Sequence, residues 1–286
     1  MKNLLCLALL LIFSTAVFAS EQTPKSNWAK FGENKIHYYD VGSKKNKDTI
    51  VFVHGWTCTA DFWRGQIGAF PKMRVVAIDL PGHGRSDKPE TQYSMEFFAK
   101  AIESVMNHAK IERAVLVGHS MGTPVIRQFY RLYPQKTAGL VIVDGALRPM
   151  ASKEAMAGYI GMMRANYKET APRMVDGMLQ PIKDDKLKQE IRSSMLATPE
   201  FVALSAMEGM ADEKNWTNDK INVPVLAVMA KSPVWASDTE QFYRTIAPNL
   251  EFQMWDGVSH FLMMEQPAKF NSALQAFLAG NKLAKN

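Results

Sequence analysis

Short, almost wholly apolar runs alternate along the chain with longer amphipathic segments. Residues 28–41 alternate apolar and polar positions around Gly32, Glu33 and Asn34, which predicts a hairpin. The apolar runs predicted as strands are 49–53, 74–78, 114–117, 139–143, 223–229 and 250–255. The segments predicted as helices are 61–70, 94–111, 121–133, 239–247 and 268–278. Apolar strands alternating with helices predict an α/β fold, with a mostly parallel sheet covered on both faces.

One long segment interrupts this alternation. Residues 147–220 contain no convincing strand and predict several helices, broken near Pro172, Pro181 and Pro199. This segment also holds nine of the 18 methionines. We therefore expect a helical cap at 147–220, inserted into a core formed by residues 20–146 and 221–286. Methionine side chains adapt to apolar ligands, but they equally fill cores between helices.

The first residues have the pattern of an export signal. Lys2 precedes the apolar run 4–13, and small residues end at Ala19, where a signal peptidase would cut. We expect residues 1–19 to be removed and the protein to be periplasmic or secreted. The run is short for a membrane span, although an N-terminal anchor is the alternative, and no later segment is long and apolar enough.

Cysteine content and charge narrow the function classes. With Cys6 inside the expected signal, Cys58 stands alone, so neither an internal disulfide nor a cysteine-rich metal site is expected. The net charge is +6, and its densest run, Lys44, Lys45 and Lys47, is interpreted as a solvated turn and not as a nucleic-acid patch. Phosphate loops, metal-ligand spacings and dinucleotide fingerprints are absent from the sequence, so no cofactor is expected.

A candidate nucleophile lies between a predicted strand and a predicted helix. Gly118-His119-Ser120-Met121-Gly122 matches the G-x-S-x-G pattern, which requires that context. A sharp, strained turn would lift the Ser120 hydroxyl clear of the sheet, and glycines two residues to either side avoid steric collision. The start of the following helix would favour a developing oxyanion.

Three further motifs accompany this one in order: His54-Gly55-Trp56, the run 79–86 of sequence DLPGHGRS, and Gly257-Val258-Ser259-His260. With them the chain resembles the α/β-hydrolase superfamily, from about residue 28 to the last helix. The resemblance is to the cap-bearing branch of esterases, cofactor-free haloperoxidases, lactonases and haloalkane dehalogenases. Dehalogenases and epoxide hydrolases of this fold carry aspartate at the position of Ser120, so acyl transfer through serine is the expected chemistry.

The resemblance also implies a base and an oxyanion hole. Of the six histidines, His260 alone follows a late strand, where the family places its base, and the order Ser, acid, His fits. The main-chain N–H groups of Trp56 and Met121 are the implied oxyanion donors. The Trp56 side chain would then line the acyl pocket or serve in packing only.

The acid of the triad has two candidates. Relatives usually carry it after the strand at 223–229, but here Ser232 stands where the aspartate would precede a proline. The next carboxylate, Asp238, is interpreted as part of a capping box with Ser237 as the N-cap and Glu240 at N3. Asp144, after the preceding strand, is the favoured acid, because some haloalkane dehalogenases and their relatives place theirs there. Absence of an acid is the third alternative.

These residues predict a hydrolase of small or medium apolar carboxylic esters, acting through an acyl-Ser120 intermediate. A lactone, such as an acyl-homoserine lactone, or a carbon–carbon bond is the alternative substrate, and cofactor-free perhydrolysis is left open as a side activity. A protein of a different class, which keeps the fold and binds a ligand without turnover, is the third hypothesis. Labelling of Ser120 by a fluorophosphonate separates enzyme from binder.

Overall fold

The computed structural model describes residues 24–44 and 48–284 of the chain. The expected export signal, residues 1–19, lies outside them, as do Lys45 and Lys47, so these interpretations stay predictions. Within the described residues, no helix combines the length and the apolar character that crossing a membrane requires.

A single eight-stranded sheet forms the centre of the described fold, in the order β1-β2-β4-β3-β5-β6-β7-β8. The strands are β1 (Ser26–Phe31), β2 (Asn34–Val41), β3 (Thr49–Val53), β4 (Arg74–Ile78), β5 (Ala114–His119), β6 (Thr137–Val143), β7 (Val225–Ala230) and β8 (Leu250–Trp255). β2 is antiparallel to both of its neighbours, while all pairs from β4 across to β8 are parallel. The predicted α/β fold with a mostly parallel sheet is confirmed.

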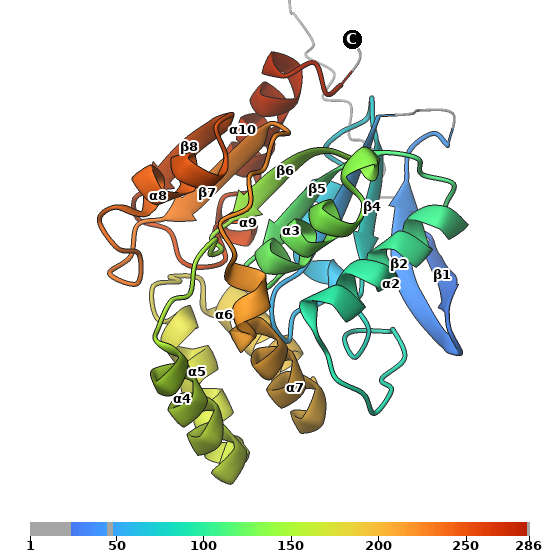
Figure 1. The fold of residues 1–286 in the computed structure, drawn as a ribbon. Helices are drawn as coiled ribbons and strands as arrows, with labels where there is room; N and C mark the ends of the chain where they lie inside the picture. Colours follow the sequence, from blue (N-terminus) through green and yellow to red (C-terminus); the bar gives the residue numbers. More distant parts are fainter. Residues whose placement is uncertain (1–23, 45–47, 285–286) are drawn as a thin grey trace, which may run out of the picture.

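Helices cover the sheet because its central strands are buried on both faces. The core helices are α1 (Arg64–Ile67), α2 (Met95–His108), α3 (Gly122–Leu132), α8 (Thr239–Ile246), α9 (Leu262–Glu265) and α10 (Pro267–Gly280). α2 and α3 lie side by side against one face of the sheet (Figure 1). The helix predicted at 61–70 is shorter than expected, since a 3₁₀ turn, η1 (Ala60–Trp63), precedes the single turn α1.

Segment 147–220 is helical throughout its regular structure. It contains α4 (Lys153–Ala165), α5 (Tyr167–Leu179), α6 (Asp185–Leu196), α7 (Glu200–Ala211) and the 3₁₀ turn η3 (Glu213–Trp216). These helices gather beyond one end of the sheet (Figure 1). The predicted break at Pro172 is wrong: this proline lies inside α5, and the chain instead breaks at Asn166, which has a non-helical backbone. Pro199 is the residue before α7, and Pro181 lies between α5 and α6.

Candidate active site

Ser120 occupies a strained turn at the carboxyl end of β5. Its φ angle is 52°, in the left-handed region that a residue with a side chain rarely adopts. Its N–H donates to Val143 O at 3.0 Å, and α3 begins two residues later. A Cβ on Gly118 would lie 2.4 Å from the Gly122 oxygen, and a Cβ on Gly122 would lie 2.5 Å from Val53 O. The two glycines therefore permit the turn that the motif predicted.

Asp144 follows the neighbouring strand β6 and is in contact with His260. The His260 Nδ1–H donates to Asp144 Oδ2 at 2.6 Å, because an ionised carboxylate only accepts hydrogen bonds. The other oxygen, Oδ1, accepts the Ala230 N–H at 2.8 Å and the Trp235 indole N–H at 3.0 Å. Asp144 is only 4% exposed. Three donors thus hold a buried carboxylate in one orientation and leave Nε2 of His260 without a proton, as a general base requires.

The loop that carries His260 is itself fixed to the turn at Ser120. The His119 Nε2–H donates to the His260 carbonyl at 2.8 Å, and the two rings lie with centroids 4.6 Å apart. Burial holds the pKa of His119 well below its usual range, so this ring is neutral. A second hydrogen bond holds the same loop, since Glu265 accepts the Ser259 N–H at 2.7 Å.

Ser120 and His260 therefore belong to the same edge of the sheet. The residue preceding Ser120 bonds the main chain of His260. Within the described part of the chain, the Ser120 hydroxyl forms no hydrogen bond with the imidazole. Hydrogen bonds between a catalytic nucleophile and its base are often long or misaligned before substrate binds. The absence of a hydrogen bond here is therefore compatible with proton transfer from Ser120 to His260.

Asp238, the other candidate acid, is bonded to Arg148 and not to His260. Its carboxylate is paired with the Arg148 guanidinium, with 3.0 Å between Nη1 and Oδ2, and this hydrogen bond lowers the pKa of Asp238. The predicted capping box is wrong. Asp238 and not Ser237 is the N-cap of α8, and its side chain makes no capping bond because Arg148 engages it.

The loop after β3 brings Trp56 next to the turn at Ser120. A Cβ on Gly55 would lie 3.1 Å from Ser120 Cβ and 2.9 Å from His119 Nδ1, so the two backbones are in close contact. Among the described residues, the main-chain N–H groups of Trp56 and Met121 have no hydrogen-bond partner. Met121 precedes the first turn of α3, where N–H groups are free by geometry. Both implied donors are thus available.

A second Ser–His–Asp chain has a different character. His37 bonds Asp79 through Nδ1 at 2.8 Å and Ser26 Oγ through Nε2 at 2.9 Å. Burial disfavours the charge on Asp79, but hydrogen bonds from His37 and from the Ala60 N–H outweigh it and lower the pKa. Ser26 lies in the regular pairing of β1 with β2, without a strained turn. These hydrogen bonds join β1 and β2 to the residue that follows β4 and have the character of a structural contact.

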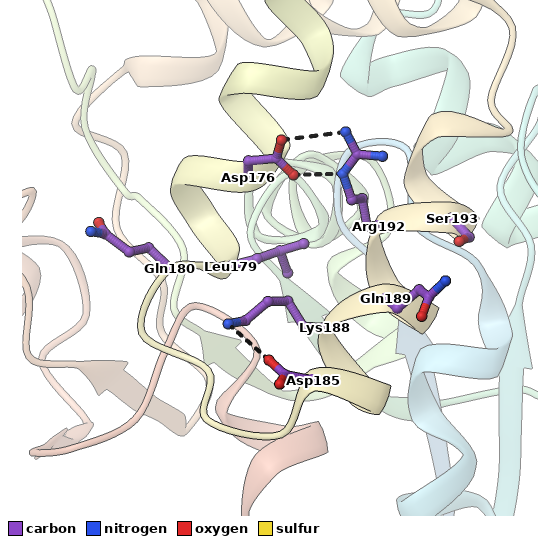
Figure 2. A pocket seen from close by; sticks show the side chains of 8 residues that line it. All are labelled: Asp176, Leu179, Gln180, Asp185, Lys188, Gln189, Arg192 and Ser193. Atoms are coloured by element: carbon purple, nitrogen blue, oxygen red, sulfur yellow. Dashed lines mark hydrogen bonds and ion pairs between the residues drawn. The ribbon is translucent and has the colours of Figure 1, made fainter.

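The cap contains a hollow of about 550 Å³ that is separate from these residues. Figure 2 shows it between α5 and α6, where Asp176 pairs with Arg192 and Lys188 pairs with Asp185. Its charged groups already neutralise one another.

The chain belongs to the family described as alpha/beta hydrolase fold, whose sequence model matches residues 48–217. Its class is therefore that of the α/β-hydrolase superfamily, as the resemblance predicted, and the protein is a hydrolase. The matched region includes Ser120 and Asp144.

Three similar proteins illustrate the range of this family. Over 272 residues the chain is 26% identical to a protein of Paraburkholderia phymatum named 2-hydroxy-6-oxononadienedioate/2-hydroxy-6-oxononatrienedioate hydrolase, covering 86% of this chain and 91% of the relative. It is 27% identical over 271 residues to the non-heme chloroperoxidase of Streptomyces lividans, covering 85% and 95%. The solved structure of Est816, described as an N-acyl homoserine lactone degrading enzyme, aligns with a TM-score of 0.73 and 25% identity over 88% of this chain and 100% of that one. The substrates named differ, so they define the class of reaction and not the substrate here.

Several residues of the site were not found from the sequence. Ala230 and Trp235 hold Asp144, and His119 holds the loop of His260. Trp235 could have been suspected from the sequence, because its indole is a hydrogen-bond donor in the loop after 223–229, where relatives usually carry the acid.

Proposed function

We propose that this hydrolase is a serine esterase that cleaves carboxylic esters of small or medium apolar substrates through an acyl-Ser120 intermediate. One observation carries the proposal. The buried Asp144 carboxylate, with three hydrogen bonds, holds the His260 ring at the same sheet edge as the strained Ser120. Nucleophile, base and orienting acid are thus the groups that acyl transfer requires.

The chemistry follows from these positions. Ser120 Oγ attacks the ester carbonyl carbon while its proton passes to Nε2 of His260, and Asp144 stabilises the imidazolium that forms. The main-chain N–H groups of Trp56 and Met121 receive the oxyanion. His260 then protonates the leaving alcohol. In the second half, water attacks the acyl carbonyl and gives its proton to His260, which releases the acid and restores Ser120.

The nine cap methionines differ in exposure: three are buried, two are exposed, and the remaining four are partly buried against the core, namely Met156, Met174, Met178 and Met210. Met163, Met195 and Met207 are buried and serve as filler between helices. Met150 and Met162 are 58% and 52% exposed, so they offer apolar surface outside that core. We expect activity to rise with acyl chain length over a p-nitrophenyl ester series if such surface contacts the acyl group.

A lactone is the second candidate substrate. A lactone is an internal ester, so the same attack by Ser120 opens its ring, and the similarity to Est816 at 25% identity favours this substrate class. The two candidates are separated by comparing the kcat/KM for acyl-homoserine lactones with the kcat/KM for open-chain esters of equal acyl length.

The proposal is tested with a fluorophosphonate probe, which phosphonylates an activated serine. The folded protein should be labelled at Ser120, as located by peptide mass spectrometry, and Ser120→Ala should not be labelled. Folded protein without labelling would favour the hypothesis of a ligand-binding protein without turnover. A label at another serine would contradict the assigned nucleophile.

A further inference from the structure

Side chains fix the direction of the peptide group between Gly55 and Trp56. The Gly55 carbonyl accepts the His54 Nδ1–H at 2.8 Å and the Cys58 N–H at 3.2 Å. His54 carries its proton on Nδ1 because Nε2 accepts the Leu80 N–H at 3.0 Å. In a trans peptide the carbonyl and the N–H point in opposite directions. Holding the Gly55 oxygen therefore also aims the Trp56 N–H.

The Trp56 side chain is attached to the cap. Its indole N–H donates to the Ala203 carbonyl of α7 at 2.7 Å, and the residue is only 5% exposed. A second bond runs alongside, from the Thr198 hydroxyl to the Thr57 carbonyl at 3.2 Å. Thr57 has a φ of 56°, so this loop adopts a backbone that needs outside support. The implied oxyanion donor is thus held by His54 from the core and by α7 from the cap.

We propose that the Trp56 indole is a positioning group, which uses its hydrogen bond to Ala203 of the cap to hold its own main-chain N–H toward Ser120. This inference rests on the proposed function. It assigns the cap a part in the chemical step as well as in binding substrate. The indole bond and the oxyanion donor belong to one residue, so a shift of α7 is transmitted to the donor without any intermediate residue.

A packing role would give a different result, and the chain supplies a matched control. Trp216 donates its indole N–H to Met210 of the same helix α7 at 3.1 Å, and in the described part of the chain no side-chain hydrogen bond joins it to the turn at Ser120. Trp56→Phe and Trp216→Phe each remove one indole donor to α7 and keep an aromatic ring. If Trp56 serves only in packing, the two substitutions should affect catalysis alike.

The experiment compares wild type, Trp56→Phe and Trp216→Phe on one p-nitrophenyl ester. Misplacing an oxyanion donor affects the transition state, so kcat of Trp56→Phe should fall about tenfold or more, with KM within about twofold. The rate of inactivation by a fluorophosphonate should fall in the same ratio. Trp216→Phe should keep both rates within about twofold. Thr198→Val, which leaves the indole in place, should lower kcat in the same direction and by less.

Two outcomes would overturn the inference. One is an equal loss of kcat in Trp56→Phe and Trp216→Phe, and the other is a change in KM alone. If Trp56→Phe does not fold, Thr198→Val carries the test, and an unchanged kcat there would count against the inference. If the proposed function itself is wrong, the result is distinguishable, because the wild-type protein would then neither react with the fluorophosphonate nor hydrolyse the p-nitrophenyl ester.

Discussion

Replacing Asp144 by asparagine should disable the enzyme without unfolding it. The carboxylate accepts two N–H groups at Oδ1, from Ala230 and Trp235, and the His260 Nδ1–H at Oδ2. Asparagine has one oxygen and one NH₂ group. Its oxygen must face the two fixed N–H donors, so the NH₂ group faces His260 Nδ1. The imidazole then has to carry its proton on Nε2, where it cannot accept the proton of Ser120.

The size of the loss follows from this tautomer change. In serine-protease triads the same substitution lowers kcat by about 10⁴, equivalent to roughly 5.5 kcal/mol of lost transition-state stabilisation. We expect a loss of this order in Asp144→Asn. Two of the three hydrogen bonds to residue 144 are retained, so the free energy of unfolding should fall by no more than about 1–3 kcal/mol.

The assay is hydrolysis of p-nitrophenyl butyrate at pH 8, with circular dichroism melts to confirm folding. Asp238→Asn is the matched control. It removes the exposed pairing with Arg148, so kcat should stay within about twofold of wild type. Full activity in Asp144→Asn together with loss of activity in Asp238→Asn would refute the assignment of the acid.

Two predictions concern stability. Burial lowers the pKa of His54 and His119, and that of His83 to about 3, so below about pH 6.5 the unfolded chain binds protons that the folded chain does not. Urea titrations should show the free energy of unfolding falling as pH drops below about 6.5, by up to about 1.4 kcal/mol per pH unit for each histidine that stays neutral in the folded chain. A free energy of unfolding that does not change with pH would contradict neutral burial. Gly122→Ala places a Cβ 2.5 Å from a β3 carbonyl oxygen, and it should cost about 3 kcal/mol or more. Gly158→Ala, in open space on α4, should be neutral or stabilising by up to about 1 kcal/mol. Equal changes in the free energy of unfolding for the two variants would refute the claim that a steric clash excludes a side chain at Gly122.

The parts of the site predicted from sequence are those decided locally. The strand before Ser120, the helix after it and the glycines at 118 and 122 lie within a few residues of one another, and steric contact within that segment dictates the turn. His260 was found from its place after the last strand. The positions of β3 to β8 followed from short apolar runs, because both faces of a parallel sheet are buried, whereas β1 and β2 followed from alternating apolar and polar positions.

The parts decided by distant residues could not be predicted. β6 and β7 are adjacent and parallel, so an acid after either strand was geometrically acceptable. The loop after β7, where the resemblance placed the acid, instead supplies the Ala230 and Trp235 donors that hold Asp144. The capping box failed for a different reason, since the helix begins one residue later than that box requires and Arg244 engages the Glu240 carboxylate.

The central claim is that an acyl group is carried by Ser120 during turnover. Mixing the protein with p-nitrophenyl acetate, quenching in acid within one turnover and mapping peptides by mass spectrometry tests it. We predict one acetyl group on Ser120, which disappears at the rate of steady-state turnover and is absent in Ser120→Ala. Hydrolysis by wild type at full rate with no acetyl group on Ser120, or with the group on another residue, would contradict the account.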